Sequence, residues 1–265
     1  MRDRQRQVMV TASAALMILG TLFGFGLIGT PVEASSSGAF SAEATLLAPA
    51  VRAFSIWSVI YLGLIGYVVW QWLPANRQSP RARRIGTLSA VSMLLNGLWL
   101  AVTQLGLLWL SVVVILALAI TLGLLLQRLG DSVDATAAER VVLDLTFGLY
   151  LGWVSVATLA NVTAVLVAYG ISPALPAAEI WAVAVLAVGA ILGVVLARAL
   201  GGRLSVAGAM GWGLLWIAVG RFTGEPESMI TGVTAAIATV VVLAAALFVL
   251  LPRVTPRPTL ATVLR

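Results

Sequence analysis

The sequence contains no cysteine, no histidine and no lysine, and only 10% of its 265 residues are charged. The absence of cysteine excludes disulfides, thiolate nucleophiles and sulfur-bound metals. The absence of histidine excludes imidazole metal ligands and every catalytic device of the Ser-His-Asp or Cys-His kind. Most hydrolase and redox-metal functions are therefore excluded, and the sequence predicts neither catalytic nor metal-binding residues.

Apolar residues take their place, at 61% of the chain with a mean hydropathy of +1.06. They form blocks of about 20 residues, the length of a helix that crosses a bilayer core. The blocks are continuous and lack the alternation of barrel strands. The sequence predicts an all-α, polytopic transmembrane helical bundle of about eight spans. These are Val8–Thr30, Val51–Leu73, Ile85–Leu105, Leu107–Leu126, Val141–Tyr169, Ile180–Leu200, Leu204–Gly220 and Met229–Leu251.

Arginine supplies all 16 basic residues, and its distribution predicts the orientation of the spans. With the N-terminus in the cytoplasm, only Arg52 and Arg221 lie outside, which leaves 14 of the 16 inside. The positive-inside rule then predicts a multi-pass protein of the cytoplasmic (inner) cell membrane with both termini cytoplasmic. The same asymmetry accounts for the net charge of +6 without nucleic acid as a partner.

The first block has two interpretations. A basic start, an apolar core and Val32-Glu33-Ala34 before a serine run resemble a signal peptide. The apolar run is long for a signal peptide, and proline and glutamate are poor cleavage signals, so we expect a retained span. Residues 31–49 then form the longest outside loop.

Charged residues are absent from the middle of every block, which argues against ion-coupled transport. Asp144 lies one turn inside the fifth block, at the spacing of an interfacial ion pair with Arg140. The turn Arg81–Arg84 is interpreted as a topology anchor near anionic lipid. Close helix packing is expected at three Gly-x-x-x-Gly pairs, Gly20/Gly24, Gly148/Gly152 and Gly189/Gly193.

Aromatic and polar side chains recur at helical spacing on three blocks, and most lie in the outer half of the bilayer in this orientation. The stripes are Phe54, Trp57 and Tyr61 on the second block, Ser92, Asn96, Trp99 and Thr103 on the third, and Tyr150, Trp153, Ala157 and Asn161 on the fifth. A cavity lined by aromatic faces and a few amides suits a flat lipophilic ligand.

Tryptophan also gathers at membrane surfaces in interfacial belts. We adopt that interpretation for Trp70, Trp72, Trp109 and Trp181, which lie near the ends of their blocks. Trp99 and Trp153 lie too deep for a belt, and we expect them in the interior.

The three striped blocks resemble the TspO/MBR family, the tryptophan-rich sensory proteins related to the mitochondrial translocator protein. Trp57 and Tyr61 match its Trp-x-x-x-Tyr span, and Leu95-Asn96 with Trp99 match its Leu-Asn-x-x-Trp signature. The best match is LYLGWVSVATLAN, from Leu149 to Asn161.

The resemblance implies two regions. Residues 1–170 would form a TspO-like five-helix transmembrane bundle, and residues 171–265 would add three transmembrane helices and a short cytoplasmic tail. Weak echoes of the earlier spans in this second region leave a parallel four-plus-four repeat as an alternative.

Members of this family bind porphyrins and other flat lipophiles under their first loop. The resemblance therefore implies a sensory or binding protein for a tetrapyrrole, with membrane lipid and a small lipophile as partners and a homodimer left open. No cofactor is required beyond a bound porphyrin. The implied ligand-binding residues are Trp57, Tyr61, Asn96, Trp99, Tyr150, Trp153, Ala157 and Asn161. The alternatives are a transporter of such a lipophile and Trp-dependent porphyrin photodegradation, the one enzymatic activity that fits.

The chain departs from the family pattern in four places. Of the Pro-rich segment before the second helix only Pro49 remains, and Leu149 replaces a proline. The fourth block lacks the usual acidic residue, and no basic sterol-recognition segment follows Asn161. These departures affect the expected loop over the pocket and sterol binding more than the fold.

Overall fold

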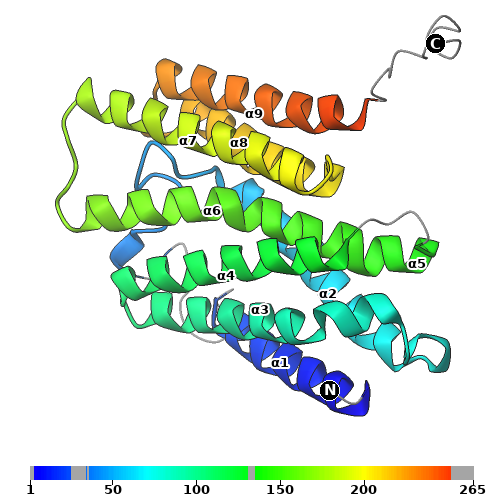
Figure 1. Cartoon of the computed structure of the whole chain (residues 1–265). Helices are drawn as coiled ribbons and strands as arrows, with labels where there is room; N and C mark the ends of the chain where they lie inside the picture. Colours follow the sequence, from blue (N-terminus) through cyan, green and yellow to red (C-terminus); the bar gives the residue numbers. More distant parts are fainter. Residues whose placement is uncertain (1–2, 25–33, 35, 131–134, 252–265) are drawn as a thin grey trace, which may run out of the picture.

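A computed structural model describes residues 3–24, 34, 36–130 and 135–251. Within these ranges it contains eight long helices and no strand (Figure 1). The long helices are α1 Asp3–Gly24, α2 Ile56–Trp72, α3 Pro80–Gln104, α4 Leu108–Leu129, α6 Thr146–Ala168, α7 Ala177–Ala199, α8 Leu204–Thr223 and α9 Met229–Leu250. The short elements are η2 Ser36–Gly38, η3 Val51–Ser55, η4 Pro74–Asn76, α5 Ala137–Glu139 and the π-helical η5 Arg140–Leu145.

The all-α, multi-pass architecture is confirmed. Seven of the described helices are long and apolar enough to cross a membrane, and α1 is not among them. The first turns of α1 carry the polar run Asp3–Gln7, so the expectation that α1 crosses the membrane stays a prediction. The predicted end of that span, residues 25–30, and Val32 and Glu33 of the candidate cleavage site lie outside the described residues.

Several helices begin before their apolar blocks, and at two of them a capping side chain marks the start. The third block was expected to begin at Ile85, but α3 begins at Pro80, where the hydroxyl of Ser79 caps the helix by accepting from Ala82 N. The fifth was expected to begin at Val141, but helical structure begins at Ala137 behind a capping box. Capping side chains satisfy the first free N–H groups, so they set a helix start where hydropathy does not.

The helices pack in an order that differs from their order in the chain. α1 packs on α3, α3 on α4, α4 on α6, α6 on α8, α8 on α9, and α9 on α7, while α2 contacts α1, η5 and α6 (Figure 1). The series α1–α3–α4 is thus matched by α6–α8–α9, as a four-plus-four repeat would require. The remaining helices differ, because α7 packs on α9 whereas α2 packs on α1 and α6. The repeat stays a prediction.

Small residues bring α6 and α8 close together. A Cβ atom added at Gly152 would overlap the carbonyl oxygen of Val206 and lie 2.8 Å from the Cβ of Ala209. One added at Gly148 would overlap Ser205. The expected packing role of this glycine pair is confirmed, and it seats α8 directly on α6. Gly20 likewise faces Gly97 of α3, and Gly193 faces Val242 of α9.

Gly152→Ala should therefore destabilise the protein by about 1–3 kcal/mol, because the added methyl forces α6 and α8 apart. Gly123→Ala on α4 is the matched control, since a Cβ there meets no atom within 4 Å. That change should leave stability unaltered or slightly raised. Reversible unfolding in detergent measures both, and equal effects would contradict the contact.

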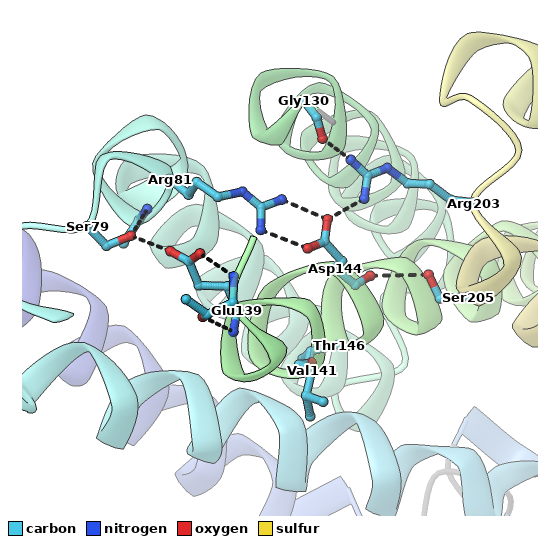
Figure 2. Close-up of polar contacts among 11 residues, drawn as sticks. Ser79, Arg81, Gly130, Glu139, Val141, Asp144, Thr146, Arg203 and Ser205 are labelled. Carbon is cyan, nitrogen blue, oxygen red and sulfur yellow. Dashed lines mark hydrogen bonds and ion pairs between the residues drawn. The ribbon is translucent and has the colours of Figure 1, made fainter. Parts of the chain in front are cut away.

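An ion-pair cluster ties three helical segments together next to the contact of Gly148 with Ser205. The carboxylate of Asp144, in η5, accepts hydrogen bonds from both terminal nitrogens of Arg81 of α3, at 2.8 and 2.9 Å (Figure 2). It also accepts one from Nη1 of Arg203, just before α8, at 2.5 Å. Arg203 also donates to the carbonyl oxygen of Gly130 after α4. The hydroxyl of Ser205 donates to the backbone oxygen of Asp144 at 3.1 Å.

In place of the expected ion pair with Arg140, Asp144 pairs with two residues that lie far away in the chain. Asp144 turns instead toward Arg81 and Arg203. Two arginines of the turn Arg81–Arg84, which was interpreted as a lipid anchor, form ion pairs within the protein. Arg81 pairs with Asp144, and Arg83 pairs with Asp3 of α1.

Asp144→Asn should destabilise the protein by about 3 kcal/mol, because it leaves two largely buried guanidinium groups without their shared carboxylate. Arg83→Gln is the control, since the side chain of Arg83 is exposed and its pair with Asp3 is screened by solvent. It should change stability little. Thermal unfolding in detergent compares the two variants, and equal shifts would show that the cluster is not a structural tie.

Candidate functional site

The eight predicted ligand-binding residues come together in one interior between α2, α3 and α6. Six of them are buried, namely Trp57, Asn96, Trp99, Tyr150, Trp153 and Asn161, and Tyr61 and Ala157 are half-buried against them. The helical spacing of the three stripes therefore identified the facing sides of three separate helices.

The inner part of this interior is a packed cluster of aromatic rings. Trp57 stacks on Tyr61 with ring centroids 5.2 Å apart and meets the rings of Tyr150 and Trp153 edge-on at 6.0 and 6.1 Å. The hydroxyl of Tyr61 donates to Oδ1 of Asn96 at 3.0 Å. Stacked and edge-on pairs of this kind favour a fixed arrangement of the rings. These rings therefore pack against one another beneath the polar group described next.

A polar group lies nearer the loop end, where α3, α4 and α6 meet. Nε1 of Trp99 donates to Oδ1 of Asn161 at 2.9 Å, and Nδ2 of Asn161 donates to the hydroxyl of Ser111 at 2.9 Å. All three side chains are buried. Ser111 was not predicted, because a single serine near the start of an apolar helix gives no periodic signal. The bonds fix the ring of Trp99 against α6.

A cavity of about 50 Å³ opens above these groups. Its floor and walls come from α3, α6 and η3, and its cover comes from the loop of residues 36–50, which we call the lid. The lid is drawn in blue at the left-hand end of the molecule in Figure 1, opposite the cluster of Asp144. The lining residues are Ala39, Phe40, Ser41, Thr45, Ala48, Pro49, Phe54, Trp99, Trp153, Val156, Ala157, Ala160, Asn161 and Ala164.

Four predicted residues line this cavity directly: Trp99, Trp153, Ala157 and Asn161. The other four, Trp57, Tyr61, Asn96 and Tyr150, lie beneath it and support it. The lid residues were missed, because an irregular loop has no periodicity to read. Ala160 and Ala164 were also missed, although with Ala157 they follow helical spacing and mark a shallow strip on α6.

The cavity is smaller than the 300–1,000 Å³ typical of sites for drug-sized ligands. Phe40 of the lid accounts for part of the closure, since its ring meets Trp99 edge-on at 6.1 Å. A cavity of about 50 Å³ has no room for a flat macrocycle in this arrangement of the lid. The structure therefore represents a closed state of the site.

The tryptophans assigned to interfacial belts divide into two kinds. Trp109 and Trp181 are exposed at helix ends, at 49% and 64%, as a belt requires. Trp70 is only 6% exposed, so its assignment was wrong. The first turns of α1 cover this end of α2, where Gln7 donates to the carbonyl of Gln71 at 2.6 Å. Hydropathy alone does not show such a cover.

The number, length and hydropathy of the described helices define the chain as a multi-pass helical membrane protein, with a small aromatic cavity between α3, α6 and the lid. A family model described as TSPO-like protein matches residues 8–249, and the chain belongs to that family. The comparison with curated proteins and that with solved structures find no match. The matched range runs through α9, beyond the predicted five-helix bundle that contains the motifs. The division near residue 170 stays a prediction.

Proposed function

We propose that the protein binds a flat lipophilic ligand of the tetrapyrrole class in the cavity beneath the lid. The observation that carries this proposal is the composition of the lining. Four aromatic rings border the cavity, those of Phe40, Phe54, Trp99 and Trp153. Asn161 is the one amide among the lining residues. Flat aromatic faces favour a planar ligand, and a single amide orients it with little desolvation.

A binding or sensory role fits the site better than catalysis or transport across the membrane. TSPO-like membrane proteins are generally non-enzymatic receptor and transport proteins. The packed rings of Trp57, Tyr61 and Tyr150 close the interior below the cavity, which argues against a continuous route across the membrane in this state. The chain has no histidine or cysteine to ligate iron, so a metal-free porphyrin is the appropriate probe.

We also propose that the lid faces the outside of the cell membrane and that both termini are cytoplasmic. α1 begins and α9 ends at the same end of the molecule, on the right in Figure 1. The arginines of the Asp144 cluster lie at that end too, and basic residues favour the cytoplasmic side. The ligand would then enter from the outer leaflet or the outer surface.

Single cysteines test this orientation cleanly, because the natural chain has none. Glu43→Cys in the lid should react with a membrane-impermeant maleimide on intact cells, whereas Gln78→Cys before α3 should react only after the cells are opened. Both positions are exposed, so their reactivity reports the side of the membrane. The reverse pattern would overturn the orientation.

Trp153→Leu should weaken the binding of metal-free porphyrin roughly tenfold, since it removes a stacking face beyond the area that leucine still buries. Trp181→Leu is the matched control, because this tryptophan is exposed on α7, away from the cavity lining. It should leave binding unchanged. Titration of purified protein followed by porphyrin absorbance measures both. Equal losses would mean that the tryptophans act only as anchors.

A further inference from the structure

The lid is attached mainly to α8, a helix outside the predicted five-helix bundle that contains the family motifs. We propose that α8 is the clamp that holds the lid over the cavity, and that Arg221 is its positioning residue. The proposal deepens the proposed function, because it assigns to the C-terminal helices the control of access to the same site. The contacts between α8 and the lid are all made within the protein, so they can be tested without a ligand.

Arg221 is the centre of the attachment. It lies near the end of α8 with only 2% of its surface exposed. Its Nη1 donates to the carbonyl oxygens of Thr45, at 3.2 Å, and Pro226, at 2.8 Å. Its Nη2 donates to those of Ala42, at 3.0 Å, and Glu225, at 3.1 Å. One guanidinium thus joins the middle of the lid to the turn between α8 and α9.

Two further contacts hold the C-terminal part of the lid against the same helix. The amide of Ala50 donates to the carbonyl of Trp216 at 3.1 Å, and Nε1 of Trp212 donates to the carbonyl of Ala53 at 2.9 Å. Gly220 allows this approach, since a Cβ there would lie 3.3 Å from the amide nitrogen of Ala50. From Ala42 to Ala53 the chain therefore follows α8.

The N-terminal part of the lid rests on α3 instead, through different contacts. The hydroxyl of Ser36 donates to the carbonyl of Thr103 at 2.7 Å, and Phe40 meets the ring of Trp99. Neither contact involves a charged group, whereas hydrogen bonds from a guanidinium are about twice as strong as neutral ones. The lid therefore hinges on α8 and opens between Phe40 and Trp99. A ligand would pass between the lid and α3.

Thiol labelling measures the clamp directly. In a Thr45→Cys background the cysteine is a buried part of the clamped segment and should react with a maleimide only when that segment leaves α8. Adding Arg221→Met removes two charge-assisted bonds to the lid and should raise the labelling rate roughly 10- to 100-fold in lipid nanodiscs. Arg52→Met is the matched control, because Arg52 is exposed in η3, close to the lid in the chain, and it should leave the rate unchanged.

A second variant and a wild-type measurement keep the test decisive if Arg221→Met does not fold. Trp212→Phe keeps the ring but loses the bond to Ala53, and should raise the labelling rate by a smaller factor, roughly threefold to tenfold. In the unmodified protein, hydrogen exchange should be slower at the amide of Ala50 than at those of Ala39 and Ser41. Unchanged labelling in every folded α8 variant, or equal exchange across the lid, would overturn the clamp.

Porphyrin binding separates the two proposals. If metal-free porphyrin binds, its dissociation should be faster in Arg221→Met than in Arg52→Met, and equal rates would overturn the control of access by α8. If porphyrin does not bind the wild-type protein, the proposed ligand is wrong. The labelling and exchange results then still decide whether α8 holds the lid, because both are measured without a ligand.

Discussion

The close approach of α6 and α8 is the constraint on which the arrangement of the site depends. Gly148 and Gly152 remove the side chains that would keep the two helices apart, so the backbone of α8 lies against the helix that carries Trp153 and Asn161. Helices in lipid gain little from hydrophobic burial, and tight van der Waals contact has to supply the association. Asp144 then fixes the same pair at one end through Arg203 and Ser205. The other end of α8 is thereby brought beside the lid.

This placement explains how a buried guanidinium is tolerated at Arg221. A cation removed from water is costly unless hydrogen bonds replace its hydration. Four backbone carbonyls do so, and two of them belong to the lid. These carbonyls lie in irregular chain, where few intrahelical bonds would satisfy them. Arg221 therefore gains hydrogen bonds for its guanidinium, and the segment of the lid after η2 is held in place without a helix of its own.

Sequence periodicity could predict the helical part of the site but not its cover. The stripes through Trp57, Asn96 and Trp153 repeat at helical spacing, and such spacing places side chains on one face whatever the neighbouring helix. Ser111 and Phe40 reach the site from a helix end and a loop, where no repeat exists. The partners of Asp144 were missed for a related reason, since Arg81 and Arg203 are about 60 residues away in the chain and spacing along one helix cannot indicate them. The burial of Trp70 could not be predicted either. The polar first turns of α1 cover it, and the hydropathy of a segment does not show which other segment packs on it.

If the proposed ligand binds beneath the lid, its binding and the opening of the lid form one equilibrium. Where only a fraction of molecules is open, the apparent affinity falls by that fraction. Contacts on the α3 side, such as Phe40 against Trp99, set how often the gap opens, and contacts on α8 set how far the lid can withdraw. A clamp that holds one side firmly keeps Thr45, Ala48 and Pro49 in place as part of the wall while the other side moves. A ligand entering past Phe40 therefore meets a wall that is already formed, and only the α3 side of the lid has to be ordered around it.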